Sequence, residues 1–202
     1  MNKGKLFIIS GPSGSGKDTV LSNLLGKHPE IKLSISSITR PMRNGEVEGE
    51  KYHFITREEF ESMIERDQLL EHNVFVGNYY GTPKQPVIDA INNGIDMILE
   101  IDVNGAKQIR EKLPDAVSIF IMPPSYKELE RRLIGRGTDT IEVIEKRLNS
   151  ALKEIARADE YDYVVTNDVV DKCVDDILHI ILAQRLTSAR QTNLIEEVLN
   201  KC

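Results

Sequence analysis

One glycine-rich segment constrains the fold of this chain more than any other feature. Residues 11–17 read Gly-Pro-Ser-Gly-Ser-Gly-Lys and fit the pattern G-x-x-x-x-G-K. The apolar residues 5–10 before it predict a buried strand. Apolar side chains at helical spacing in residues 17–27 predict a helix after it. Strand, glycine loop and helix in this order begin a βαβ unit.

This loop predicts a binding site for the phosphates of a nucleotide. Glycines let successive backbone N–H groups turn inward around phosphate oxygens, and the helix N-terminus adds its positive dipole end. Lys17 adds a mobile point charge for the β- and γ-phosphates. We expect these residues to bind the phosphate donor: Gly11, Pro12, Ser13, Gly14, Ser15, Gly16, Lys17, Asp18 and Thr19.

The residue after Lys17 departs from the general pattern. That position should be Ser or Thr, whose hydroxyl binds Mg²⁺, but here it is Asp18, and Thr19 follows. Asp18 could lie on the Mg²⁺ side, act through a water, or be a solvated carboxylate that favours the helix dipole. The sequence leaves open whether Asp18 or Thr19 serves the metal.

The pattern after the loop predicts an α/β fold. Strand-like apolar runs at 97–101, 117–122 and 163–166 alternate with helical patterns near 83–93, 105–112, 125–133, 141–156 and from about 170. This alternation predicts a parallel sheet with helices on both faces, a P-loop NTPase core. We expect the last helix to pack against the sheet, with a dimer contact as the alternative.

Residues 34–82 break the alternation. They are rich in Thr, Arg, Gly, Glu and Tyr, with short alternating pieces at 52–54 and 74–76. We expect one domain over residues 1–202, with a core formed by 1–33, 83–130 and 158–202. Residues 34–82 would form a small, mostly β lobe inserted into it, and about 131–157 a helical lid.

Charge and cysteine content exclude several classes of protein. Lys and Arg total 26 against 32 Asp and Glu, so the net charge of −6 argues against non-specific binding to nucleic acid or membranes. Cys173 and Cys202 lack metal-ligand spacing and are expected to be free thiols in a reducing compartment. Without a signal-peptide pattern or a membrane-length apolar run, we expect a cytoplasmic protein.

A second cluster of phosphate-binding side chains follows the first helix. Residues 34–54 combine hydroxyl groups with Arg40 and Arg43 in a turn-rich segment. Arginine can bind phosphate bidentately, and hydroxyl groups can complete the shell. A solvated basic loop is an equally good interpretation of this segment alone. Behind a phosphate-binding loop, it predicts a second phosphorylated substrate.

The chain resembles guanylate kinase from Gly4 to about Asp168. The matching segments are 11–17, 36–40 with Arg43, 45–49, 77–82, 99–102, 123–125, 135–138 and 167–168. Residues 77–81, Gly-Asn-Tyr-Tyr-Gly, together with the upstream arginine pair, are specific to this family rather than to P-loop kinases generally. The resemblance implies transfer of the ATP γ-phosphoryl group to GMP, with Mg²⁺ as cofactor.

The resemblance also implies how GMP would be bound. The residues implied for its phosphate are Ser36, Arg40, Arg43, Tyr52 and Tyr80, and those for its guanine are Glu71 and Thr82. A carboxylate can accept from both N1–H and N2–H₂ of guanine, and a hydroxyl can meet O6. Without the resemblance, Glu71 after Leu69 and Leu70 would be interpreted as an exposed charge.

Two carboxylates end an apolar strand, where parallel sheets place their binding sites. The resemblance puts Glu100 on the Mg²⁺ side, through water, and Asp102 near the acceptor and its arginine. Many family members have Asp in place of Glu100, so the longer side chain could shift a bridging water while keeping the charge.

The remaining implied residues surround ATP. Arg132, Arg136 and Arg147 would belong to a lid that covers the phosphates, and Asn167 would lie by the adenine. Ordinary surface cations are the alternative interpretation, and the better one for Arg131. The catalytic set is then Lys17, Arg40, Arg132, Arg136 and Arg147, which act by positioning and charge neutralisation.

Two other functions remain possible from sequence. One is a kinase for another small molecule, against which Glu71, Thr82 and the paired tyrosines argue. The other is a guanylate-kinase-like scaffold that binds proteins and has lost activity. We expect dGMP to be phosphorylated as well, but the sequence does not decide to what extent, or whether the protein is a monomer or a homodimer. The apolar residues Leu194, Ile195, Val198 and Leu199 could pack on the core or on a second subunit.

Overall fold

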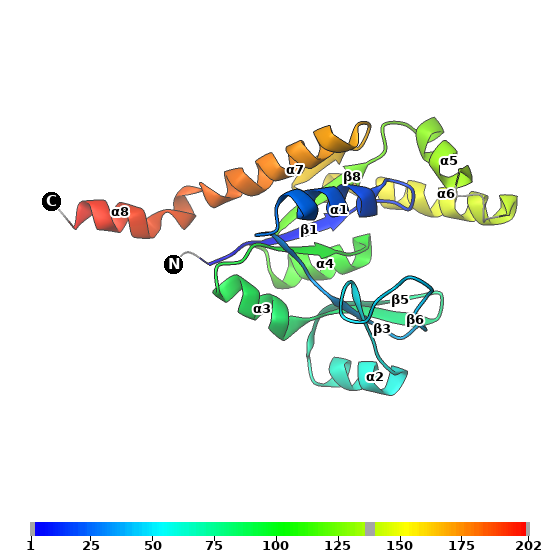
Figure 1. The fold of residues 1–202 in the computed structure, drawn as a ribbon, viewed down its shortest axis with the longest axis horizontal. Coiled ribbons are helices and arrows are strands. Elements are labelled where there is room, and N and C mark those ends of the chain that lie inside the picture. Colours follow the sequence, from blue (N-terminus) through cyan, green and yellow to red (C-terminus); the bar gives the residue numbers. More distant parts are fainter. Residues whose placement is uncertain (1–2, 136–139, 201–202) are drawn as a thin grey trace.

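A five-stranded parallel sheet forms the centre of the molecule. The computed structural model describes residues 3–135 and 140–200. The strands lie in the order β2 (Lys32–Leu33), β7 (Met97–Glu100), β1 (Leu6–Ser10), β8 (Val117–Met122) and β9 (Tyr163–Thr166), each parallel to its neighbours. Figure 1 shows β1 and β8 near the centre of the molecule. β1 lies in the middle, so the glycine loop that follows it leaves the carboxyl edge of the sheet at its centre.

Helices cover both faces of this sheet. Phe7 and Ile9 of β1 face α1 (Lys17–Lys27) and α7 (Val170–Arg185). Leu6 and Ile8 face α3 (Lys84–Asn92) and α4 (Val103–Lys112). All four side chains are buried, as expected for a continuous apolar strand covered on both sides. The predicted fold class is confirmed.

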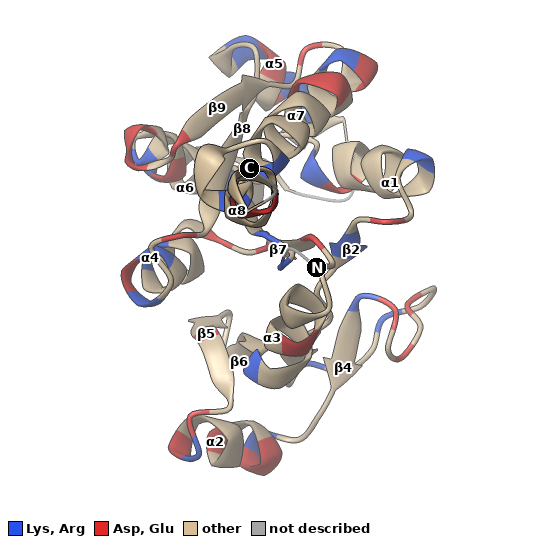
Figure 2. Ribbon diagram, turned by 90° about the vertical axis from the view of Figure 1, so that its left-hand side faces the viewer, with Lys and Arg blue, Asp and Glu red and all other residues tan. Residues whose placement is uncertain are grey.

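A second sheet forms the lobe between β2 and α3. Its order is β4 (Tyr52–Phe54), β3 (Ser36–Ile38), β6 (Asn78–Pro83) and β5 (Leu69–Phe75). Figure 2 shows this lobe below the core, with α2 (Arg57–Glu65) at its far end. β4 and β5 are therefore the two opposite edges of the lobe.

The lobe contains one helix that the sequence patterns did not predict. Thr56 begins α2 with a capping box, in which Thr56 Oγ1 accepts from Glu59 N and Glu59 Oε2 accepts from Thr56 N. Phe60 is buried and stacks on Tyr79 of β6 at 5.0 Å between ring centroids. One buried anchor residue and a cap suffice to hold this short helix, without a long apolar stripe.

Two helices pack together beyond β8. α5 (Tyr126–Ile134) and α6 (Ile141–Ile155) bury a small cluster of Leu129, Leu133, Leu148 and Ala151 between them. The one-turn helix η1 (Ala158–Glu160) then leads into β9. The predicted site residue Arg136, with Gly137 and Thr138, lies outside the described residues.

The C-terminal helices differ in how they are covered. α7 buries Val174, Ile177 and Ile181 against the sheet, so the prediction that it packs there is confirmed. After η2 (Ser188–Arg190), α8 (Thr192–Leu199) extends away from the core (Figure 1). Leu194, Ile195, Val198 and Leu199 are 47–68% exposed. The alternative that they pack on the core is therefore wrong.

Over residues 3–135 and 140–200, no helix combines the length and the apolar character that crossing a bilayer requires.

Candidate active site

The loop between β1 and α1 has the geometry that its glycines predict. Gly14 and Gly16 have φ angles of +89° and +86°, which L side chains rarely adopt. A Cβ at Gly16 would also come within 2.4 Å of Asn167 Nδ2. Lys17 Nζ donates to Gly11 O at 2.6 Å, so its ammonium is folded back over the loop. Burial lowers the pKa of Lys17, while the carboxylates of Glu100, Glu154 and Asp18 act in the opposite direction.

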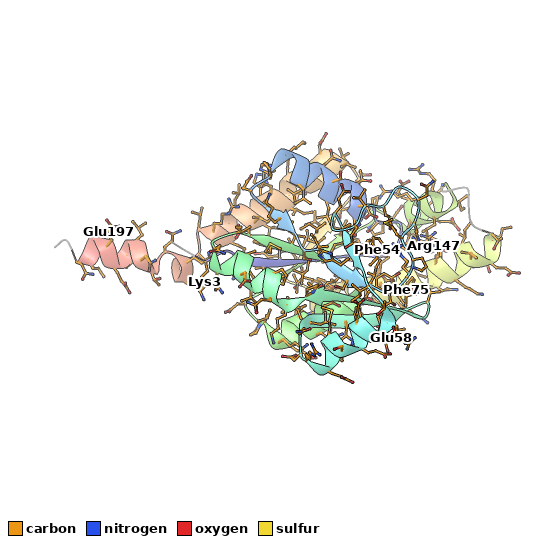
Figure 3. The ribbon with its side chains drawn as sticks, turned by 60° about the horizontal axis from the view of Figure 1, so that its bottom comes forward. Lys3, Phe54, Glu58, Phe75, Arg147 and Glu197 are labelled. Atoms are coloured by element: carbon orange, nitrogen blue, oxygen red, sulfur yellow. The ribbon has the colours of Figure 1, made fainter. Side chains whose placement is uncertain are left out.

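Two predicted arginines contact this loop from the α5–α6 helix pair. Arg132 Nη1 donates to Ser15 O at 3.3 Å and Nη2 to Asn167 O at 3.0 Å. Arg147 Nη2 donates to Ser13 Oγ at 2.7 Å. In Figure 3, Arg147 lies on the same side of the molecule as Phe54 of the lobe, far from Glu197 on α8. The structure thus brings Arg132 and Arg147 to the phosphate-binding loop.

Asn167 connects β9 to the same loop. Its Nδ2 donates to Ser15 O at 2.7 Å, and the side chain is only 2% exposed. In the part of the chain that the structure describes, Asn167 Oδ1 and Ser15 Oγ are both buried without a hydrogen-bond partner. Since buried polar atoms are normally paired, these two atoms favour a role for the loop in binding a polar group.

A buried carboxylate and hydroxyl lie side by side in the lobe. Thr82 Oγ1 donates to Glu71 Oε1 at 2.7 Å, and their residues are 0% and 4% exposed. The interpretation of Glu71 as an exposed charge is therefore wrong. A Cβ at Gly105 would lie 2.6 Å from Glu71 Oε2, so α4 approaches the carboxylate closely because it has glycine there. Burial raises the pKa of Glu71 to about 7, and the charge of Asp102 adds to this effect.

Asp102 joins α4 to the lobe. Its Oδ1 accepts from the backbone N atoms of Asn104 and Gly105, both at 2.8 Å, so it is the N-cap of α4. Its Oδ2 accepts from Asn73 Nδ2 of β5 at 2.6 Å. α4 therefore begins two residues before the predicted helix at 105–112, because Asp102 caps it.

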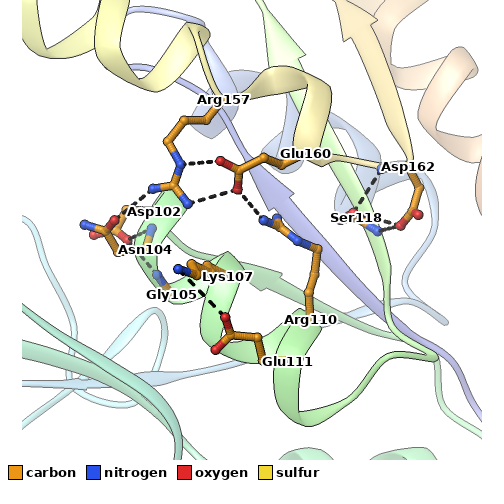
Figure 4. Close-up of polar contacts among 10 residues, drawn as sticks. All are labelled: Asp102, Asn104, Gly105, Lys107, Arg110, Glu111, Ser118, Arg157, Glu160 and Asp162. Carbon is orange, nitrogen blue, oxygen red and sulfur yellow. Dashed lines mark hydrogen bonds and ion pairs between the residues drawn. The ribbon is translucent and has the colours of Figure 1, made fainter.

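Arg157, which had no predicted role, belongs to a charged network beside α4 and Asp102 (Figure 4). Arg157 donates to Asn104 Oδ1 at 2.9 Å and to Glu160 Oε1 at 2.8 Å. Arg110 donates to Glu160 Oε2 at 2.7 Å. Glu160 raises the pKa of Arg157 most, and Asp102 contributes. This network fixes the start of α4, on which both Asp102 and Gly105 depend.

Arg40 is the buried cation of the lobe. Its guanidinium is 9% exposed and binds Glu46 bidentately, at 2.7 Å from Nη1 and 2.5 Å from Nη2. The pair raises the pKa of Arg40 and lowers that of Glu46 to about 2. The guanidinium lies 5.4 Å from the Tyr52 ring centroid, and Tyr80 also interacts with it. Glu46 lies within the segment 45–49 that carried the resemblance, but it had no predicted role.

The other predicted residues of this cluster differ in exposure. Ser36 pairs with Tyr52 in the β3–β4 register, and the Tyr52 ring lies beside Arg40. The Arg43 side chain is exposed, and its backbone N donates to Glu46 Oε2 at 2.7 Å. The paired tyrosines separate: Tyr80 faces Arg40, whereas Tyr79 stacks on Phe60 and bonds to Glu61 and Arg57. Tyr79 therefore belongs to the lobe's own packing.

Lys51, which has no predicted role, contacts two predicted residues. Its Nζ lies 2.5 Å from Asp18 Oδ1 and 3.0 Å from Glu100 Oε2. Thr19 is exposed at the start of α1, with its backbone O accepting from Asn23. Among the described residues, no group of three or more His, Cys, Asp or Glu is arranged to hold a metal. Mg²⁺ needs only one or two carboxylates beside substrate phosphates, so Asp18 and Glu100 fit that requirement.

Glu154 of α6 is a further residue, after Glu46 and Lys51, that was not expected from the sequence. Burial raises its pKa, and the charge of Lys17 acts in the opposite direction. It thus belongs to the charged surroundings of Lys17. It lies on the predicted lid helix, but no motif identified it.

Comparisons with known proteins agree with this geometry. The family model described as guanylate kinase matches residues 3–184. A guanylate kinase of Neisseria gonorrhoeae is 49% identical over 98% of this chain and 96% of that protein. One of Halalkalibacterium halodurans is 50% identical over 96% and 94%. The crystal structure of guanylate kinase from Anaplasma phagocytophilum superposes with a TM-score of 0.78, at 36% identity over 94% of this chain and 90% of that one.

Proposed function

The chain belongs to the guanylate kinase family, and we propose that it transfers the γ-phosphoryl group of ATP to GMP with the residues described above. The products are ADP and GDP. The buried Glu71–Thr82 pair carries the acceptor assignment, because it presents a carboxylate and a hydroxyl, with Thr82 on the strand that also carries Tyr80, a partner of Arg40.

The donor half of the site would hold ATP on the loop between β1 and α1. Backbone N–H groups of residues 11 and 13–19 would surround the phosphates, with Lys17 at the β- and γ-phosphates and Asn167 near the adenine. Arg132 and Arg147 neutralise charge that develops on the transferred group, and we expect Arg136 to join them.

Mg²⁺ bound with ATP would be held on the side of Glu100, through water, and of Asp18 or Thr19. It supplies charge neutralisation at the phosphates. The positions of Asp18 and Glu100, both within 3.0 Å of Lys51 Nζ, support this assignment.

The acceptor half would hold GMP in the lobe. Its phosphate would contact Ser36, Arg40, Arg43, Tyr52 and Tyr80. Its guanine would be read by Glu71, which accepts from N1–H and N2–H₂, and by Thr82. Asp102 would fix the acceptor site through Asn73 and α4. GMP phosphate would replace Glu46 on Arg40, since both ligands use the same guanidinium N–H groups.

The chemistry then needs no strong general base, because the attacking phosphate oxygen of GMP is already anionic. Positioning and charge neutralisation supply the catalysis. Approach of the lobe (34–82) and the lid (131–157) to the core would exclude water and suppress ATP hydrolysis. We further propose a cytoplasmic enzyme, monomer or homodimer, that acts on small molecules and not on nucleic acid or membranes.

The test is ADP release with ATP and Mg²⁺ across GMP, dGMP, AMP, CMP and UMP. We expect rapid turnover with GMP, some with dGMP and almost none with the others. Lys17→Ala should reduce turnover with GMP by at least about 100-fold while GMP still raises the melting temperature. Turnover with a different acceptor would refute the assignment of Glu71 and Thr82. Stabilisation by neither nucleotide would indicate a scaffold.

A further inference from the structure

Lys51 is the cation through which the outer edge of the lobe reaches the core. It directly precedes β4, one edge of the lobe sheet. Its Nζ lies 2.5 Å from Asp18 Oδ1 on α1 and 3.0 Å from Glu100 Oε2 at the end of β7. One ammonium thus joins the lobe to two separate elements of the core.

The opposite edge of the lobe is held differently. β5 packs against α4, where Gln108 Nε2 donates to His72 O and Lys112 Nζ to Leu70 O, both at 2.8 Å. Asn73 adds its bond to Asp102. These contacts hold the β5 edge of the lobe against the core. The tilt of the lobe sheet about that edge then depends on contacts at the opposite edge, β4, where Lys51 lies.

The chain places Lys51 next to both substrate sites. Lys51 is covalently joined to Tyr52, which lies beside Arg40, and Asp18 is covalently joined to Lys17. The ion pair therefore sets the separation between a residue of the acceptor phosphate site and the lysine of the donor phosphate site.

We propose that Lys51 is a positioning residue for phosphoryl transfer, whose ammonium between Asp18 and Glu100 holds the acceptor lobe against the donor loop. This inference rests on the proposed function. Lys51 and Asp18 are 40% and 71% exposed, and pairs of that exposure contribute little to folding. Glu100 is only 15% exposed, so the ammonium is held at the core side by a better shielded carboxylate. Loss of Lys51 should mainly disturb the alignment of the two substrates, because the reacting atoms must lie about 3–3.5 Å apart and in line.

The kinetic test compares Lys51→Ala with Lys51→Arg and a matched control. Lys84→Ala removes an ion pair with Asp67 whose partners are 40% and 76% exposed, almost the same as for Lys51 and Asp18. At saturating MgATP and GMP, we expect Lys51→Ala to lower kcat about tenfold or more. Lys51→Arg should recover most of that loss, and Lys84→Ala should change kcat less than about twofold. Asp18→Asn should cost less in the Lys51→Ala background than in the wild-type protein.

A distance measurement gives a readout that needs no turnover. Spin labels at Ser22→Cys on α1 and Glu58→Cys on α2 report the separation of core and lobe. Cys202 is replaced by Ser, and the buried Cys173 stays unlabelled. We expect Lys51→Ala to broaden the distance distribution toward longer values, with and without GMP, and Lys84→Ala to leave it unchanged.

An unchanged distribution with kcat within twofold in Lys51→Ala would overturn the proposal. The proposal would also be overturned if Lys51→Ala required less Mg²⁺ at an unchanged kcat. That result would indicate that the Lys51 ammonium only occupies the Mg²⁺ position beside Asp18 and Glu100. If the wild-type protein did not phosphorylate GMP, the proposed function would fail, while the distance measurement would still test the contact.

Discussion

Glu71 is the single side chain whose environment says most about the site. It is 4% exposed, bonds to Thr82 and lies against Gly105 of α4. An ionised carboxylate buried in this way is costly unless several donors satisfy it. In the proposed site, guanine would supply the missing donors through N1–H and N2–H₂. The same side chain would then give both affinity and discrimination against adenine.

The raised pKa of Glu71 leads to a pH prediction. Its pKa increases from 4.5 to about 7, so at pH 6 only about a tenth of the carboxyl is ionised before GMP binds. Because guanine requires the carboxylate, the KM for GMP should fall about tenfold between pH 6 and pH 8. Titration of the GMP phosphate also contributes to the pH profile of KM. The Glu71→Gln variant shows the phosphate contribution alone, because the amide does not titrate in this range. An identical profile in the two proteins would contradict the assignment.

The same shift acts on folding with a defined sign. A carboxyl whose pKa is higher in the folded chain binds more protons there than in the unfolded chain. The contribution of Glu71 to stability is therefore most favourable below pH 4.5 and declines as the pH rises to about 7. GMP should offset this loss above pH 7.

Among the helices, α2 shows how a local signal can replace an apolar stripe. It has one buried residue, Phe60, and begins with a complete capping box at Thr56 and Glu59. Thr140 occupies the same N-cap position at α6, with extended backbone, but makes no side-chain cap bond. Thr56 and Thr140 are both N-cap residues, but only Thr56 makes a side-chain cap bond, so the pair allows the stability effect of that bond to be compared.

We expect Thr56→Ala to lower the free energy of unfolding by about 1 kcal/mol, because the N–H of Glu59 loses its acceptor. Thr140→Ala should change it by less than about half of that value, since no cap bond is lost. Urea unfolding followed by circular dichroism measures both. Equal losses in the two variants would show that the cap bond of α2 does not stabilise the chain.

At the scale of the whole molecule, the C-terminal segment has two parts: η2, which contacts the core through Arg190, and α8, which does not bury any residue. Arg190 Nη2 donates to Lys3 O, and its Nη1 lies 4.0 Å from Asp96, so η2 is tied to the core. Beyond it, α8 has no buried residue. The division predicts that the stability of the fold depends on η2 and not on α8.

A chain ending at Gln191 should therefore unfold with a free energy within about 0.5 kcal/mol of the full chain. A chain ending at Leu186 should lose more than about 1 kcal/mol, because it lacks Arg190. Light scattering on the same samples reports the mass in solution. A large loss of stability on removing α8, accompanied by a fall in mass, would mean that its apolar side chains are covered by a second subunit.

Local patterns in the sequence were sufficient for the core of the fold and for the donor loop. Strands β1, β7 and β8 are short apolar runs that end in turn residues, and buried parallel strands have this signature. The apolar run of β9 was also recognised as a strand, but β9 lies at the sheet edge and buries only Val165. The loop at 11–17 is recognisable because its backbone angles require glycine. Neither α2 nor α8 was predicted as a separate helix, although Leu194, Ile195, Val198 and Leu199 recur at helical spacing in α8.

Only the tertiary structure decided which charged side chains meet. Arg40 pairs with Glu46, and Lys51 reaches Asp18, 33 positions earlier in the chain, as well as Glu100. Sequence reasoning named Asp18 and Glu100 as carboxylates near a metal but could not see their shared lysine. The physical reason is that hydrophobic periodicity reports which face of an element is buried. The distance between side chains on separate elements depends on how the lobe sits against the sheet, which no local pattern encodes.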